Sequence, residues 1–80
     1  MSKGFENWGW RTIIANDALT GTTYEISLQS FTGKFRVNGV SVERTRAFET
    51  PGEETASTLT LQGKGITAHL KLIDLQRLLQ

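Results

Sequence analysis

The single histidine is the first residue type that could do chemistry, and its setting favours a structural role. His69 is the only histidine among 80 residues, and the chain has no cysteine. Alternation over residues 66–72 places His69 on the face opposite the apolar side chains, where we expect it to be exposed. A transition-metal site would have carboxylates as its other ligands, which suits zinc poorly. We therefore predict no metal site, no disulfide and no thiolate nucleophile.

The acidic residues form a second candidate for chemistry. Glu53 and Glu54 are adjacent, and Glu49 lies close in sequence. Acid–base catalysis requires carboxylates at a fixed separation with different pKa values. Residues 49–56 hold the only proline and have the composition of an exposed loop, so we expect a solvated acidic segment. No Gly-x-Ser-x-Gly motif is present. The sequence predicts that the protein is not an enzyme and carries no cofactor.

Two tryptophans are the first candidates for a binding surface. Trp8 and Trp10 are two residues apart, so they share one face of a strand. One interpretation places both in a small core that depends on aromatic side chains. The functional interpretation leaves them exposed as an interaction hot spot. Together with Arg44 and Arg46, they are the predicted partner-binding residues.

Basic and aromatic residues interleave in the middle of the chain. Phe35 shares a face with the neighbouring valines and is expected in the core, whereas Lys34 and Arg36 point to the opposite face. A cationic groove with stacking aromatics is typical of small β-domains that bind single strands. An alternative nucleic-acid-binding set is therefore Lys34, Arg36, Arg44, Arg46 and Phe31. The net charge of only +1 argues against tight nonspecific binding.

The strongest structural signal is an Asn-Gly pair between two alternating runs. Asn38 and Gly39 accommodate the positive φ angles of a type I′ turn, so we predict a hairpin. Its register pairs Val37 with Val40, and the apolar side chains share one face with Phe35.

A second hairpin is predicted near the C-terminus. Residues 58–61 and 66–72 alternate on either side of a glycine-rich turn. The preferred interpretation continues into a short helix over residues 75–80, with Asp74 as its N-cap. The alternative is one helix over residues 66–80.

These elements predict a mainly β, β-rich α+β fold in a single small globular domain, residues 1–80. We expect a small antiparallel meander of five to six short strands, curled or barrel-like, with a short C-terminal helix. No apolar run is long enough for a signal peptide or a membrane span, which predicts a cytoplasmic protein without membrane contact. Whether the sheet closes into a barrel stays open.

The leading functional hypothesis is a non-enzymatic interaction module that binds a macromolecular partner, first of all a protein. Regulators, inhibitors and assembly proteins, some of them encoded by phages and mobile elements, are often compact single chains of this size. The alternatives are nucleic-acid binding through the basic-aromatic hairpin and homo-oligomerisation through sheet edges and the leucine-rich C-terminus. The sequence does not identify the partner.

Overall fold

Six strands and one helix follow one another along the part of the chain that the computed structural model describes, residues 8–45 and 58–80. Each strand pairs antiparallel with the next one. The strands and the helix are β1 (Trp10–Asn16), β2 (Thr23–Gln29), β3 (Phe35–Val37), β4 (Val40–Arg44), β5 (Thr58–Gly63), β6 (Ile66–Lys71) and α2 (Leu72–Leu79). The predicted meander with a short C-terminal helix is confirmed.

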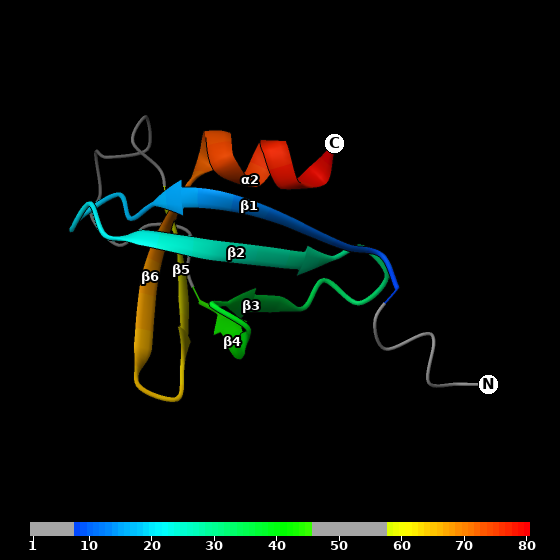
Figure 1. The fold of residues 1–80 in the computed structure, drawn as a ribbon, viewed down its shortest axis with the longest axis horizontal. Helices are drawn as coiled ribbons and strands as arrows, with labels where there is room; N and C mark the ends of the chain where they lie inside the picture. The colour runs from blue at the N-terminus through cyan, green and yellow to red at the C-terminus, as the bar shows by residue number, and fades with distance from the viewer. Residues whose placement is uncertain (1–7, 46–57) are drawn as a thin grey trace.

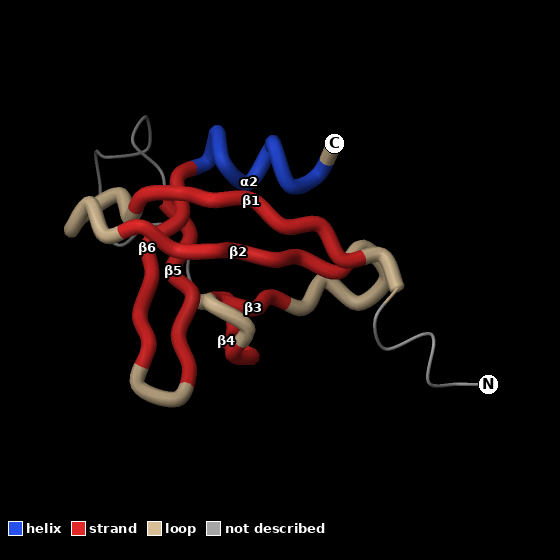
Figure 2. The backbone as a smooth tube through the Cα atoms, viewed as in Figure 1, coloured by secondary structure: helices blue, strands red, loops and turns tan. Residues whose placement is uncertain are grey.

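The sheet curls strongly and forms a half-barrel (Figure 1). The long β1–β2 pair lies beside α2 (Figure 2). The β5–β6 hairpin is steeply inclined to the β1–β2 pair. β1 and β6 are the two edges of the sheet, and no ladder joins them within the described residues. Helix α2 contacts both edge strands and so covers the seam between them. In the described residues, the sheet is therefore an open half-barrel with α2 packed against both of its edge strands.

The core lies on the inner face of this curled sheet. Period-two alternation directs every second side chain inward. Phe35 is 4% exposed and Val37 is fully buried, which confirms the predicted inward face of the first hairpin. Trp8 and Trp10 are absent from the buried set, so the interpretation of these tryptophans as core residues is wrong. The buried apolar residues are Ala15, Ile26, Leu28, Phe35, Val37, Val42, Leu59, Leu61, Ala68, Leu70 and Leu78.

The first hairpin has the predicted register. Val37 lies opposite Val40, and Phe35 lies opposite Val42. Both turn residues have positive φ, 52° at Asn38 and 81° at Gly39, as a type I′ turn requires. Asn38 also accepts a 2.9 Å hydrogen bond at Oδ1 from the Glu25 backbone N–H of β2. The turn is thereby attached to the neighbouring strand.

The second hairpin is packed closely against β4. Gly63 pairs with Ile66 at the end of this hairpin. A Cβ atom on Gly63 would lie 2.9 Å from the Ser41 backbone oxygen and 3.0 Å from the Val42 Cα. Such distances are shorter than real Cβ contacts, so only glycine fits here without a shift. Lys64 in the following turn has φ 49°, which is unusual for a residue with a side chain.

The chain over residues 66–72 is strand followed by helix, but the helix begins earlier than predicted. Strand β6 ends at Lys71, and α2 starts at Leu72 instead of residue 75. Lys71 is the N-cap and makes no side-chain capping hydrogen bond, so the prediction of Asp74 as the cap is wrong. Asp74 lies in the first turn, where a carboxylate complements the helix dipole, and it pairs with Arg77 at 3.0 Å.

Several predictions concern residues that the structure does not describe. Arg46 and the acidic segment over residues 49–56 lie outside the described ranges. Among the helices of residues 8–45 and 58–80, none has the length and apolar character needed to cross a membrane.

Candidate binding surface on the outer face of the sheet

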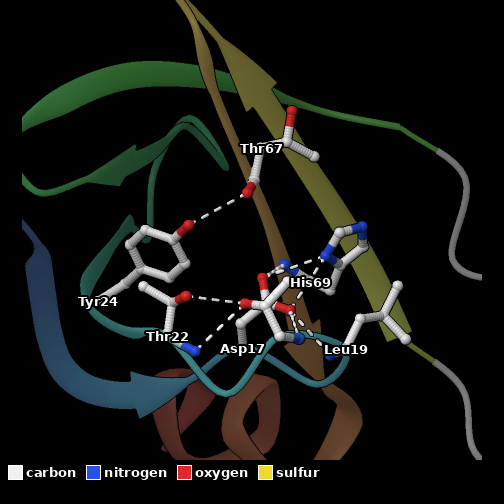
Figure 3. Close-up of polar contacts among 7 residues, drawn as sticks. Asp17, Leu19, Thr22, Tyr24, Thr67 and His69 are labelled. Atoms are coloured by element: carbon white, nitrogen blue, oxygen red, sulfur yellow. Dashed lines mark hydrogen bonds and ion pairs between the residues drawn. The ribbon is translucent and has the colours of Figure 1, made fainter.

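The Asp17 carboxylate accepts hydrogen bonds from both the β1–β2 turn and β6, and so links the two edges of the sheet (Figure 3). Oδ1 accepts hydrogen bonds from the backbone N–H groups of Leu19 and Thr20 at 2.8 and 2.9 Å. Oδ2 accepts the backbone N–H of His69 at 2.8 Å, and the His69 ring Nδ1 lies 3.1 Å from the same oxygen. An ionised carboxylate accepts hydrogen bonds but donates none, so Nδ1 carries the proton that this ring donates.

The electrostatics of Asp17 follow from this arrangement. Burial raises the pKa of the carboxyl group, because the side chain has no exposed surface. Hydrogen bonds from the backbone of Thr20, Leu19 and His69 and from the His69 ring favour the ionised form more strongly. The pKa is therefore lowered from 3.8 to about 2. Asp17 is therefore ionised at neutral pH, and backbone and side-chain groups of this chain donate hydrogen bonds to its carboxylate.

Two more hydrogen bonds cross the same seam. The Ala18 backbone N–H donates to the His69 backbone oxygen at 2.9 Å, and the Tyr24 hydroxyl donates to the Thr67 oxygen at 3.3 Å. His69 is thus part of the seam between β6 and the β1–β2 turn, which is a structural role. Its side chain is only 21% exposed, so the expectation that His69 would be exposed is wrong. No group of three or more His, Asp or Glu side chains in the described ranges could together hold a metal ion.

The outer face of the sheet carries a different kind of cluster, centred on Trp10. In β1 and β2, Trp10 lies directly opposite Gln29, so the two side chains leave the sheet on the same side. Gln29 is only 4% exposed. Its Nε2 donates to the Trp8 oxygen at 2.9 Å, and its Oε1 accepts from the Thr32 hydroxyl at 2.7 Å. Gln29 therefore holds the segment before β1 and the turn after β2 together.

Two exposed aromatic rings stack beside this glutamine. The ring centroids of Trp8 and Phe31 are 5.6 Å apart, and their planes differ by 19°. Trp8 is 59% exposed and Phe31 is 62% exposed. Gly9 between the tryptophans has φ 73°, and a Cβ atom there would lie 3.5 Å from the Phe31 ring. The glycine permits the backbone turn that brings Trp8 onto Phe31.

Arg36 of β3 is the last member of this surface. Its Cζ lies 4.1 Å from the centroid of the Trp10 ring, within the range of a cation–π interaction. Arg36 lies opposite Ser27 of β2 and Ser41 of β4, on the outward face predicted for it. We refer to Trp8, Trp10, Phe31 and Arg36 as the Trp10 surface.

A hollow of about 930 Å³ lies next to Trp10, between the face of β3 and β4 and the end of the β5–β6 hairpin. We call it the basic hollow, because three of its lining residues are cations, Lys34, Arg36 and Lys64, and one is an anion, Glu43. The other lining residues are Trp10, Gln29, Phe35, Ser41, Val42, Thr45, Gln62 and Gly63.

Of the predicted binding residues that the structure describes, Arg44 is the one that lies apart from the others. Trp10, Lys34 and Arg36 line the basic hollow. Trp8 stacks on Phe31, and its backbone oxygen accepts a hydrogen bond from Gln29 of the same lining. Arg44 is exposed, has the inward parity of Val42 and does not line the basic hollow. Arg46 lies outside the described residues.

Lys64 is the residue that sequence reasoning missed. It sits in the turn of the second hairpin, about thirty residues from Lys34, and no local pattern connects the two. The sequence signal for it is the pair of glycines that flank Lys64. A glycine in a strand often marks a close approach of another backbone, and such an approach brings the exposed residue of the turn next to that strand.

Comparison of the chain with models of protein families, with curated proteins and with solved structures found no significant match.

Proposed function

We propose that this protein is a non-enzymatic binding module that holds a protein partner on the Trp10 surface. The observation that carries the proposal is the Trp8–Phe31 stack, two large apolar rings that are more than half exposed. Both lie outside the buried cluster, which is assembled from the inner face of the sheet and Leu78 of α2. The two rings therefore do not contribute to the hydrophobic core.

The composition of the Trp10 surface supports a protein partner. Tryptophan and arginine are enriched among the residues that carry most of the binding energy in protein interfaces. Trp10 and Arg36 are already held against each other at 4.1 Å. Such pre-organisation reduces the side-chain entropy that is lost on binding. Arg44 at the end of β4 and Arg46, which lies outside the described residues, are candidates for a second contact.

The polar seam supports the non-enzymatic part of the proposal. Asp17 and His69 form the pair that most resembles a catalytic dyad, and both side chains are used to attach β6 to the β1–β2 turn. A regulator or inhibitor that works in the cytoplasm, encoded by a phage or mobile element, remains the most specific form of this proposal.

Selection from a random peptide library tests the proposal and does not require the identity of the partner. The immobilised full-length protein is used for selection, and the recovered peptides are then titrated against the variants Trp8→Ala and Leu19→Ala. Leu19 is 72% exposed and serves as the matched control, because it is apolar but lies in the β1–β2 turn. We expect Trp8→Ala to weaken binding at least about tenfold and Leu19→Ala to leave it unchanged. Peptides that bind both variants as well as the original protein would contradict the proposal.

Self-association is a second candidate, favoured by the exposed apolar residues of α2. Leu72, Ile73 and Leu79 are 51%, 64% and 67% exposed. In a homo-oligomer these side chains would be covered by a second copy. Light scattering at high protein concentration tests this directly, and a monomeric mass would remove the candidate.

A further inference from the structure

We propose that the basic hollow binds single-stranded nucleic acid, with phosphates at Lys34, Arg36 and Lys64 and bases against the neighbouring aromatic rings. This proposal goes beyond the protein partner and does not depend on it. It also differs from the nucleic-acid set expected from the sequence, because Lys64 and Trp10 take the place of Arg44 and Arg46.

Charge complementarity is the first argument. The described residues carry seven Lys and Arg side chains against four Asp and Glu side chains. Two of the four acids are satisfied elsewhere, since Asp17 is held in the seam and Asp74 pairs with Arg77. Three of the seven cations line the basic hollow, and Glu43 is the only acid among its lining residues. The hollow is thus the place where positive charge gathers in the described part of the chain.

The three cations are positioned by independent features of the fold. Arg36 is held over the Trp10 ring. Lys34 ends the turn after β2, where its backbone oxygen accepts the Gln29 N–H at 2.9 Å. Lys64 is fixed at the rim, because Gly63 beside it packs directly against the backbone of Ser41. A ligand would therefore meet an assembled site.

The aromatic rings decide between a nucleic acid and an acidic polypeptide. Each base presents a flat π-face, and stacking on exposed aromatic side chains contributes strongly to single-strand binding. Trp10 is the tryptophan that lines the hollow. Trp8 and Phe31 are more than half exposed and do not line it, but the Trp8 backbone oxygen accepts a hydrogen bond from Gln29, which does. An acidic polypeptide would use the cations but leave this stacking surface without a matching group.

The same rings favour a single strand over a duplex. In a duplex the base faces are stacked on one another, so an exposed tryptophan reaches them only after unpairing. The cations also line a concave surface, which suits a flexible backbone that can enter it. A duplex would contact only the rim.

The test is fluorescence anisotropy with a labelled thymidine oligonucleotide of about 20 nucleotides, titrated with the full-length protein at about 50 and 200 mM salt. Single strands lose affinity with a logarithmic slope of about 0.7 per neutralised phosphate, so three contacts predict about 18-fold weaker binding at the higher salt. We expect a micromolar dissociation constant at the lower salt. A labelled duplex of the same length should bind more weakly.

The variants locate the site. Lys64→Gln removes one phosphate contact, which predicts about eightfold weaker binding at 50 mM salt and a weakening of about sevenfold between the two salts. Lys71→Gln is the matched control, since Lys71 is an exposed lysine at the end of β6 that does not line the hollow. Trp8→Ala should weaken binding by about five- to 150-fold, the range for loss of one stacked base. Circular dichroism confirms that each variant is folded.

Four outcomes would overturn the proposal. The first is no binding at low salt up to about 100 µM protein. The second is equal affinity of Lys64→Gln and Lys71→Gln, which would place the contact elsewhere. The third is a duplex that binds as well as the single strand. The fourth is labelled polyglutamate that binds more tightly than the oligonucleotide, which would identify the hollow as a site for an acidic protein. None of these outcomes tests the dependence of peptide binding on Trp8, so the two proposals can fail separately.

Discussion

Replacement of Asp17 by asparagine should remove much of the stability of this fold. The lowering of the Asp17 pKa from 3.8 to about 2 means that folding favours the ionised carboxyl group. A difference of about 1.8 pH units corresponds to about 2.4 kcal/mol of folding free energy at neutral pH. Asparagine has nearly the same shape, but its NH₂ group would face the N–H donor of His69 or those of Leu19 and Thr20. We therefore expect Asp17→Asn to cost at least about 2.4 kcal/mol, or roughly 10–20 °C in melting temperature.

The pH dependence has a definite sign. A carboxyl group whose folded-state pKa is lowered stabilises the fold fully above its unfolded pKa of 3.8, and this contribution is lost as the pH falls through about 2. The difference between the original protein and Asp17→Asn should therefore be largest at neutral pH. It should shrink between pH 4 and pH 2.

Urea denaturation followed by far-ultraviolet circular dichroism measures both effects. Two controls accompany the variant. His69→Ala removes the ring hydrogen bond but keeps the backbone N–H donor, so it should cost only about 1 kcal/mol. Asp74→Asn removes a carboxylate whose partner Arg77 is half exposed, so it should cost less than about 1 kcal/mol. A cost of Asp17→Asn below about 0.5 kcal/mol at pH 7, or the same cost at pH 2 as at pH 7, would refute the reasoning.

Substitutions at three further positions test packing and turn geometry by the same urea titration. Gly63→Ala should lower the free energy of unfolding by about 1–3 kcal/mol, because the new Cβ would lie 2.9 Å from the Ser41 backbone oxygen. An unchanged urea midpoint would contradict the close packing of Gly63 against β4. Leu61→Ala should cost about 2–5 kcal/mol, since Leu61 is fully buried, and a cost as small as that of an exposed leucine would contradict this account of the core. Asn38→Ala should cost about 1–3 kcal/mol through positive φ and the lost bond to Glu25, whereas Asn38→Gly should lose only the bond.

The sequence was sufficient for the parts of the fold that depend on neighbouring residues. The Asn38-Gly39 turn and the alternation around it determined the register of the first hairpin, because turn type and side-chain period are local properties. The glycine-rich turn after β5 predicted the second hairpin but not its register. The start of α2 was predicted three residues too late, because its N-cap, Lys71, makes no side-chain capping hydrogen bond and so gives no capping signal in the sequence.

The candidate sites depend on distant residues, and there sequence reasoning was incomplete. Asp17 and His69 are 52 residues apart, and the sequence around either residue does not predict their contact. Lys64 joins Lys34 and Arg36 only because Gly63 allows the hairpin to pack against β4. The pattern around the two tryptophans did not decide whether their face was buried, since an apolar residue at either parity fits a curled sheet.

The meander order has a consequence for how fast this protein folds and unfolds. Each strand pairs with its neighbour in sequence, so most strand pairing requires only short loop closures, and we expect rapid folding for a β protein. The seam joins residues 52 and 43 apart, through Asp17 with His69 and Tyr24 with Thr67. These contacts should form after the rate-limiting step. Loss of the Asp17 charge would then leave the folding rate nearly unchanged and accelerate unfolding about 60-fold, so the seam governs the lifetime of the native state.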